Sequence, residues 1–331
     1  MKAAFLDTPG PPDVIRYGDL PDPEPGPGEA RVRVAAVAVN PIDTYIRSGA
    51  VAANLPKPFV PGCDLAGVVD KLGPGATRFK VGDRVWGSNQ GLLGRQGTFA
   101  DFCCPHEDYL YPIPDGVEDE DVVALALVGI TAHLGLFQHA NLKAGEWVFV
   151  NGGTGGVGSA VVQMAKAAGA KVVTTVGSDE KAKLARGLGA DVVLNYKTDD
   201  VPVKVKGVAG PGINVWYETL PPTDLDRTIG MMAPRGRIVV MAGRAARPIF
   251  PNGPFYVKGL AMHGFAMFNA TPAEQRACAD DMNRWLAEGK LKANIGRRFK
   301  LSEAAAAHQL QEENTLKAAG TLTGKIVLTP G

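Results

Sequence analysis

The hydrophobic pattern of the chain changes character near residue 120. Before that point, apolar and polar residues alternate over short stretches, as in segment 29–39, where Arg31 and Arg33 alternate with valines. A period of two is typical of half-buried strands. Glycine or proline bounds further strand candidates at 67–71, 82–86 and 98–103. The first part of the chain is therefore predicted to be a β-rich domain.

Beyond residue 120, continuous apolar runs alternate with helical patterns. Helices are expected at 119–127, 131–139 and 181–188. The run 147–150 is apolar throughout, as expected of a parallel strand covered on both faces, and apolar residues at helical spacing follow it. Further strands are expected at 172–176, 192–194, 215–217, 238–241 and 260–265. This alternation predicts an α/β fold with a doubly wound sheet of six parallel strands.

The last part of the chain ends the alternation. Helices expected at 271–288 and 302–313 precede a final strand at 325–328, which has no helix after it. We therefore expect this strand to return to the first domain.

A glycine-rich turn follows the first strand of the predicted sheet. Three of its glycines match the spacing G-x-G-x-x-G: Gly153, Gly155 and Gly158. We assign the tight turn to the first, close approach of a pyrophosphate to the second and close helix packing to the third. The N–H groups at the helix start, around Gly156 and Val157, would face the phosphates. Because a strand precedes the turn and a helix follows it, the pattern predicts a dinucleotide site.

The end of the second strand bears on which dinucleotide binds. An NAD site usually places an acid there, but this strand ends in segment 175–178 without one. Lys181 follows, and hydroxyl and ammonium donors suit a 2′-phosphate, which favours NADPH. Asp179 and Glu180 leave an alternative open, because either could turn toward the ribose. Lys181 could equally be a solvated helix lysine.

Composition narrows the function classes. The 331 residues are 45% apolar and 21% charged, which is typical of a soluble globular enzyme. The net charge of +1 gives no basic face for nucleic acid or an anionic membrane. The chain opens without a Lys/Arg-led signal peptide, and no apolar run is long enough to span a membrane. Four irregularly spaced cysteines do not suggest a disulfide scaffold, so a cytoplasmic location is expected.

Several segments carry a resemblance that runs from end to end. Among them are "VNPIDTYIRSG" (39–49), "PGCDLAGVVD" (61–70), "GGTGGVGSAVVQMAK" (152–166) and "TGKIVL" (323–328). The chain resembles the zinc-independent, ζ-crystallin-like quinone oxidoreductases of the medium-chain dehydrogenase/reductase superfamily, and "NPIDTYIRSG" marks the quinone-reductase branch. The resemblance implies a cleft between two domains and a homodimer paired through the Rossmann sheets. The implied domains are a GroES-like catalytic domain (1–122), a Rossmann NADPH-binding domain (123–266) and a return to the catalytic domain (267–331).

The resemblance also implies site residues. Around the 2′-phosphate it places Ser178, Lys181 and Tyr196. Near the nicotinamide and the quinone pocket it places Asn40, Asp43 and Tyr45. Toward the nicotinamide ribose and the nicotinamide end it places Thr131, Gly243 and Phe265.

The roles of the residues in "NPIDTYIRSG" stay open at this point. Asp43 and Tyr45 are two apart, so on an extended segment they would project from the same face. Tyr45 could donate a proton to the reduced oxygen, or it packs in the cleft while water supplies the proton. Asn40 could hydrogen-bond the carboxamide or a ribose hydroxyl, or it forms a turn before Pro41. Arg47 could pair with Asp43.

A bound zinc is not expected. Zinc-bearing relatives place a cysteine just after the strand that ends here at Val39, and a His-Glu pair shortly before Gly67. This chain has Asn40 at the first place and Cys63-Asp64 at the second, and the four-cysteine run of a structural zinc site is missing.

The missing metal ligands bear on the reaction. Oxidising an alcohol near neutral pH calls for a Lewis acid, whereas a quinone or an enone accepts hydride directly. The sequence therefore predicts an NADPH-dependent quinone reductase acting on a small molecule. The alternatives are a reductase of α,β-unsaturated carbonyls and a non-catalytic, crystallin-like NADPH-binding protein.

Overall fold

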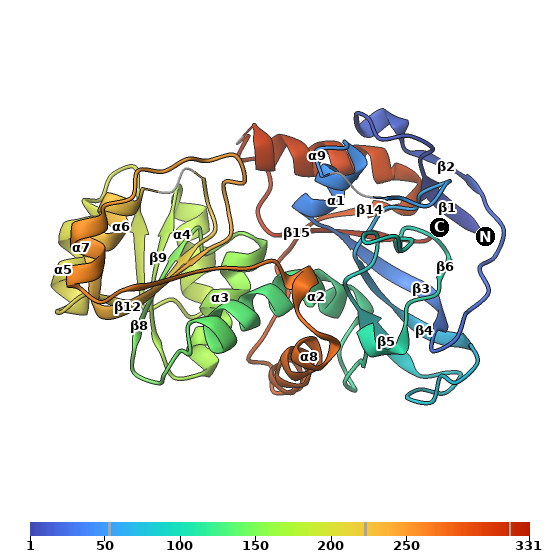
Figure 1. The fold of residues 1–331 in the computed structure, drawn as a ribbon, viewed down its shortest axis with the longest axis horizontal. Helices are drawn as coiled ribbons and strands as arrows, with labels where there is room; N and C mark the ends of the chain where they lie inside the picture. The colour runs from blue at the N-terminus through green and yellow to red at the C-terminus, as the bar shows by residue number, and fades with distance from the viewer. Residues whose placement is uncertain (52–53, 222–223, 318) are drawn as a thin grey trace. The chain divides into compact units, whose positions relative to one another are not determined.

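The computed structural model describes residues 1–51, 54–221, 224–317 and 319–331 (Figure 1). It divides into two compact units. Unit 1 comprises Met1–Leu127 and Thr271–Gly331, and unit 2 comprises Val128–Ala270.

Unit 1 is built on a seven-stranded sheet in the order β14-β15-β3-β4-β5-β7, with β6 paired to β3. The last strand, β15, pairs parallel with β14 and antiparallel with β3. A separate ribbon pairs β1 with β2. The strands are β1 (Lys2–Phe5), β2 (Arg16–Asp19), β3 (Ala30–Val39), β4 (Asp64–Leu72), β5 (Arg84–Gly87), β6 (Phe102–Cys103), β7 (Leu110–Pro112), β14 (Ile295–Lys300) and β15 (Lys325–Thr329).

Strand β3 shows why the alternating pattern gives this sheet. Val32 and Val34 are buried, whereas Arg33 between them is exposed, as the period of two predicts. Toward its end the strand is buried on both faces, and Ala38 pairs with Asp64 on β4. The carboxyl end of β3 is thus held between two neighbours, β4 and β15.

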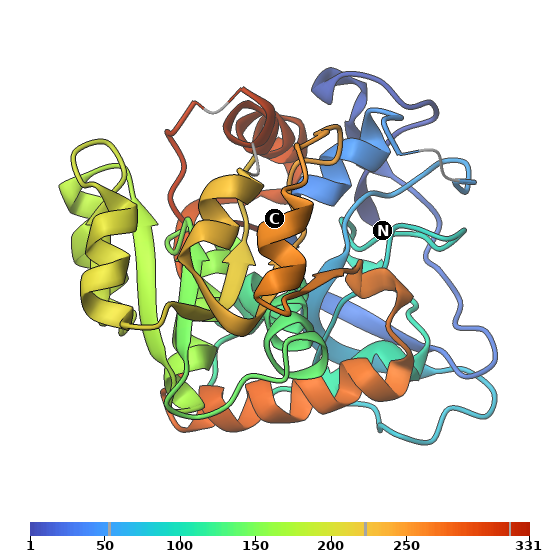
Figure 2. The ribbon, with the colours of Figure 1, turned by 60° about the vertical axis from the view of Figure 1, so that its left-hand side comes forward.

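Unit 1 also contains the helices α1 (Pro41–Arg47), α8 (Pro272–Ala287) and α9 (Ala304–Leu316). Figures 1 and 2 show α8 and α9 on opposite sides of the unit's strands. Helix α1 directly follows β3, with Asn40 at its N-cap, Pro41 at its first position and the Asp43 carboxylate accepting from the Asn40 N–H. The extended backbone expected around Asp43 and Tyr45 is therefore wrong.

Unit 2 contains a six-stranded parallel sheet in the order β10-β9-β8-β11-β12-β13, as predicted. Its strands are β8 (Trp147–Asn151), β9 (Lys171–Val176), β10 (Val192–Asn195), β11 (Ile213–Glu218), β12 (Met232–Val240) and β13 (Ala261–Gly264). Its helices are α3 (Gly156–Ala167), α4 (Asp179–Gly187), α5 (Val201–Ala209), α6 (Leu225–Met231) and α7 (Asn252–Val257). The strand order reverses between β8 and β11, the position where doubly wound sheets bind ligands.

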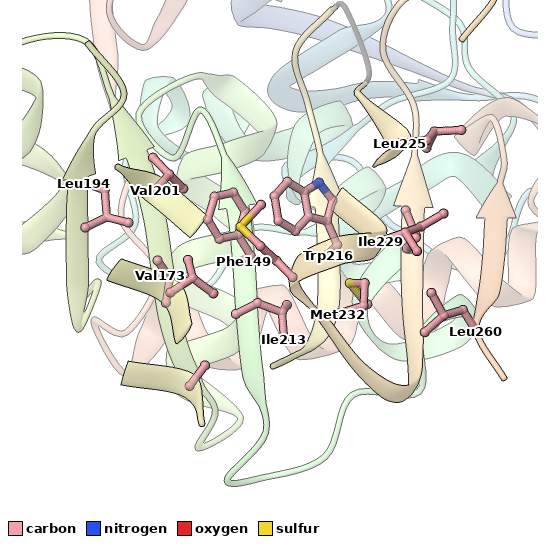
Figure 3. Close-up of a cluster of buried hydrophobic side chains, with 14 residues drawn as sticks. Phe149, Val173, Leu194, Val201, Ile213, Trp216, Leu225, Ile229, Met232 and Leu260 are labelled. Carbon is pink, nitrogen blue, oxygen red and sulfur yellow. The ribbon is translucent and has the colours of Figure 1, made fainter. Parts of the chain in front are cut away.

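One face of this sheet carries a core of side chains from five strands, covered by α5 and α6 (Figure 3). Phe149 of β8 and Trp216 of β11 stack at its centre, with 3.9 Å between ring centroids. Val201 from α5 and Ile229 from α6 pack over them. Helix α4 packs on the other face, where Ala182 meets Val176. Burial of these apolar faces is what stabilises the layers.

A long apolar helix replaces the two helices expected between 119 and 139. Helix α2 (Asp119–His133) continues without a break into a π-helical turn, η3 (Leu134–His139). Gly129 does not interrupt it, because its neighbours Val128 and Ile130 are buried and hold the helical backbone in place. The stretch is long and apolar enough to cross a membrane, but 83% of its most apolar window is buried inside the protein, as in a core helix.

Candidate functional site

The glycine turn after β8 has the geometry of a phosphate cradle, with one difference from the predicted roles. The positive φ of 82° falls on Gly152, so that residue, and not Gly153, makes the tight turn. A Cβ on Gly153 would lie 2.1 Å from the Thr174 hydroxyl oxygen on β9. Gly153 is therefore required for close packing of the turn against the neighbouring strand.

Gly158 packs closely, as predicted, and Gly155 is open to solvent. A Cβ on Gly158 would lie 2.2 Å from the Gly152 carbonyl oxygen, so α3 packs directly against the turn. Gly155 is exposed, and a Cβ there would meet only the Gly152 oxygen, at 3.5 Å. Gly155 is also the N-cap of α3, whose first N–H groups, at Gly156 and Val157, lack intrahelical acceptors. The space over Gly155 is thus open at the N-terminus of α3, the end of a helix where negative charge is stabilised.

Two threonines of β9 hold the turn through hydrogen bonds. The sequence analysis did not predict them. The Gly153 N–H donates to Thr174 Oγ1 at 3.0 Å, and that hydroxyl donates to the Val150 carbonyl at 2.8 Å. The Gly152 N–H donates to Thr175 Oγ1 at 3.3 Å. Threonines in an otherwise apolar strand next to a glycine turn were the available signal.

A buried carboxyl group lies beside this turn, at the ends of β8 and β11. Glu218 is 2% exposed, and its Oε1 accepts from Asn151 Nδ2 at 2.8 Å and from the Leu220 N–H at 3.0 Å. Its Oε2 accepts from Trp216 Nε1 at 3.1 Å. Burial raises the pKa of Glu218, although these hydrogen bonds oppose the shift. The sequence reading missed this residue as well.

The three residues expected around a 2′-phosphate lie at the ends of β9 and β10. Ser178 is the N-cap of α4, and its Oγ accepts from the Lys181 N–H at 3.3 Å. Tyr196 is 52% exposed, and a Cβ on Gly177 would lie 2.5 Å from its hydroxyl oxygen. The Tyr196 phenol therefore lies directly beside the start of α4. Asp179 is also at that helix start, and it is exposed.

The other unit 2 residues expected at the site are spread over three elements. Thr131 lies on α2, is buried, and its carbonyl accepts from the Tyr217 hydroxyl at 2.8 Å. Phe265 directly follows β13 and stacks on His139, with 4.5 Å between centroids. Gly243 lies in the loop after β12 and has a φ of 76°.

In unit 1, the adjoining ends of β15, β3 and β4 bring together a buried polar cluster. Lys325 Nζ donates to the Val39 carbonyl at 2.7 Å and to Asn40 Oδ1. Asn40 Nδ2 donates to Asp64 Oδ2 at 2.8 Å, and the Ser88 hydroxyl donates to Asp64 Oδ1 at 2.7 Å. All five residues are buried, and Lys325 was not predicted to take part.

Asp43 adjoins this cluster and has an unusual environment. Its Oδ2 accepts from the Asn40 N–H at 2.8 Å, but its buried Oδ1 has no hydrogen-bond partner in the described part of the chain. Burial raises the pKa of Asp43 to about 7. The Cys63 thiol and the Lys325 ammonium oppose that shift, whereas the Asp64 charge adds to it. Burial lowers the pKa of Lys325, and the two carboxylates counteract that effect.

Tyr45 and Arg47 lie on α1 with Asp43. Tyr45 is half-buried, and because residues two apart do not share a helix face, it points away from Asp43. Arg47 is fully buried, pairs with Glu312 on α9 and donates to the Gly10 carbonyl at 2.6 Å. The expected Arg47–Asp43 pair is therefore wrong, because α1 presents Arg47 to α9.

Comparison with known proteins agrees with both units. A family model described as the alcohol dehydrogenase GroES-like domain matches residues 26–115, and one described as zinc-binding dehydrogenase matches residues 156–287. Quinone oxidoreductase of Rattus norvegicus is 33% identical over 99% of this chain and 97% of its own length. A 2-haloacrylate reductase of Burkholderia sp. is 32% identical over 93% of this chain and 95% of its own.

A solved structure extends the comparison to three dimensions. A mycobacterial protein in complex with NADPH superimposes with a TM-score of 0.85 and 33% identity, over 100% of both chains. These likenesses extend over 99% of this chain in sequence and 100% in structure, and they agree with the glycine turn and the two sheets. The chain belongs to the quinone oxidoreductase family of the medium-chain dehydrogenase/reductase superfamily.

Proposed function

We propose that this protein is an NADPH-dependent reductase that transfers a hydride to a quinone without a metal ion. The observation that carries the proposal is the open space over Gly155 at the start of α3, beside the group formed by Ser178, Lys181 and Tyr196. The quinone oxidoreductase relative and the NADPH-bound mycobacterial structure support it.

The chain's own residues would hold the cofactor at its two charged parts. The N–H groups of Gly156 and Val157 would donate to the pyrophosphate, with Gly153, Gly155 and Gly158 allowing its approach. Lys181, Ser178 and Tyr196 would surround the 2′-phosphate. Thr131, Gly243 and Phe265 would line the nicotinamide end. Bound NADPH supplies a hydride, and the protein supplies binding and orientation.

On the acceptor side we assign Asn40, Asp43 and Tyr45. Asn40 and Asp43 are held rigidly at the start of α1, by Lys325 and by their own N-cap hydrogen bond. Tyr45 would hold the proton that goes to the reduced oxygen, at its phenol oxygen.

The residues at the expected metal position do not suit zinc. The Asn40 amide is already engaged between Lys325 and Asp64, and the buried Lys325 ammonium would repel a second cation. Among the described residues, no group of three or more His, Cys, Asp or Glu side chains is placed to hold a metal ion. A conjugated carbonyl acceptor needs no Lewis acid, which fits this donor set.

A specific observation favours a second candidate, reduction of α,β-unsaturated carbonyl compounds. The 2-haloacrylate reductase is 32% identical to this chain, and the alignment spans 95% of the reductase's own length. A crystallin-like role without catalysis would keep NADPH binding but lack turnover.

One experiment separates these functions. Purified protein is mixed with NADPH and with 1,2-naphthoquinone, 9,10-phenanthrenequinone, a 2-alkenal or 2-chloroacrylate, and NADPH absorbance is followed. Oxidation with the quinones alone supports the quinone reductase, and oxidation with the alkenes alone supports the alternative. Binding without oxidation supports the crystallin-like role, and absence of binding in calorimetry would refute all three. Activity that survives chelation, with less than one zinc per chain by elemental analysis, would support metal-free transfer.

We also propose a cytoplasmic homodimer paired through β13. This strand is at the edge of the unit 2 sheet, so one side of it is unpaired among the residues that the structure describes. Nearby apolar side chains are exposed, including Tyr256 at 67% and Val257 at 74%. All four cysteines are free, as in a reducing compartment. Light scattering on the wild type and on Val257→Glu measures the oligomeric state. A dimeric wild type and a monomeric variant would support the pairing, and a monomeric wild type would contradict it.

A further inference from the structure

Lys325 reaches its partners through the register of the unit 1 sheet. Asn40, whose Oδ1 accepts from its ammonium, lies 285 positions earlier in the chain. Ile326 pairs with Val39 across β15 and β3, and Ala38 pairs with Asp64 across β3 and β4. The ammonium is therefore fixed at the point where β3 ends and α1 begins.

The Asn40 amide lies between a cation and an anion. Its Oδ1 accepts from the Lys325 ammonium, and its Nδ2 donates to Asp64 at 2.8 Å. Turning the amide over would direct its N–H group at the ammonium and its oxygen at the carboxylate, so only one orientation is favourable. The Val39 carbonyl and the Ser88 hydroxyl hold the outer ends of this chain of hydrogen bonds.

We propose that Lys325 is a positioning residue for the acceptor site, because its ammonium orients Asn40 and thereby the start of α1, which carries Asp43 and Tyr45. The inference rests on the proposed function for its catalytic consequence only. The arrangement itself is a property of unit 1 and is testable without turnover.

The ammonium also sets the charge state of its neighbours. It is buried with Asp64, Asp43 and the Cys63 thiol, and these are the titratable groups that its own pKa responds to. Replacing it with a neutral side chain of similar length, Lys325→Met, leaves the carboxylates without a buried cation. Their ionised forms then become less favourable.

The first test compares Lys325→Met with the wild type in full-length, NADPH-loaded protein. We expect kcat with 1,2-naphthoquinone to fall by about a hundredfold, which is the scale of a misplaced site. The Kd for NADPH from calorimetry should change by no more than about fivefold, the worth of one hydrogen bond from Asn40 to the nicotinamide end, because the residues proposed to hold the phosphates are in unit 2. Equal losses in kcat and NADPH affinity, or an unchanged kcat, would overturn the inference.

The second test adds Asp64→Asn to Lys325→Met, which removes the cation and the anion on either side of the Asn40 amide. The double variant should regain thermal stability relative to Lys325→Met, because the Asp64 carboxylate is no longer buried without its cation. Its kcat should stay low, because no cation orients the amide. Recovery of kcat together with stability would show that Lys325 only balances charge, and would overturn the proposal. If Lys325→Met does not fold, the kcat of the double variant tests the proposal by itself. A low kcat supports it, and a kcat like that of the wild type overturns it.

A third measurement is independent of turnover. Carboxyl carbon NMR of Asp43 should show a pKa that is higher in Lys325→Met than in the wild type, because a positive charge has been removed. An unchanged Asp43 pKa would overturn the inference. If the wild type oxidises NADPH with none of the acceptors while this pKa rises as expected, the proposed function fails and the arrangement around Lys325 stands.

Discussion

Replacing Asp43 with asparagine should change how the stability of the protein depends on pH. Asp43 is 2% exposed, and burial raises its pKa from 3.8 to about 7. The folded protein therefore holds this proton more tightly than the unfolded chain does. The stability from this group is fully present below about pH 4, and it is lost as the pH rises through the folded pKa near 7.

The magnitude follows from the two pKa values. They differ by about 3 pH units, and each unit corresponds to about 1.36 kcal/mol, so Asp43 costs the folded state about 4 kcal/mol at high pH. Asparagine has no proton to lose and can still accept from the Asn40 N–H. The unfolding free energy of the wild type relative to Asp43→Asn should thus fall by about 4 kcal/mol between pH 4 and pH 8.

Denaturant unfolding of both proteins at several pH values measures this difference, and the titrating groups that do not interact with Asp43 cancel between them. Asp19→Asn is the control, because the Lys2 hydrogen bond lowers the pKa of the exposed Asp19 and the difference should have the opposite sign. A wild-type-minus-variant difference that stays constant with pH, or that favours the wild type at pH 8, would refute the reasoning. It would mean that Asp43 is ionised in the folded protein.

Four further predictions concern two glycines of the turn after β8, Lys181 of α4 and a buried histidine. Gly158→Ala should lower the melting temperature, at a cost of about 1–3 kcal/mol, because its Cβ would meet the Gly152 oxygen at 2.2 Å. Gly155→Ala should keep the melting temperature and lose NADPH affinity in calorimetry, and the opposite pattern would contradict the assigned roles. Lys181→Ala should weaken NADPH binding about ten- to a hundredfold and leave NADH binding unchanged, whereas equal losses would exclude a phosphate contact. His308→Leu should resist acid unfolding in circular dichroism, because burial lowers the pKa of His308 to about 3 and stability is lost as the pH falls toward that value.

Local signals in the sequence were enough to predict the parallel sheet and the position of the glycine turn between β8 and α3. Continuous apolar runs separated by helical patterns fix a doubly wound sheet, because each βαβ crossover is right-handed. The close packing at Gly158 followed from spacing alone. The positive φ at Gly152 did not, because adjacent glycines can share the turn and only the packing of Thr174 against Gly153 decides between them.

The acceptor side was harder to predict. The helix at 41–47 had a signal, since Asn40, Pro41 and Asp43 form an N-cap, a first-turn proline and a capping acid. The two-residue spacing of Asp43 and Tyr45 was instead interpreted as an extended segment, and Asp43 was considered as a partner for Arg47, which pairs with Glu312. Lys325 could not be paired with Asn40 from local pattern, because the contact depends on sheet register across 285 residues.

The placement of β15 has a consequence for how the protein is made. Unit 2 is one continuous stretch, 128–270, so it can fold as soon as it leaves the ribosome. Strand β3 cannot complete its pairing at that stage, because its neighbour β15 follows the whole of unit 2 in the chain. During that interval the β3 edge that will pair with β15 is an unpaired edge that other nascent chains can bind. We therefore expect chaperone dependence in biosynthesis to arise from unit 1, and to end when β15 closes that edge.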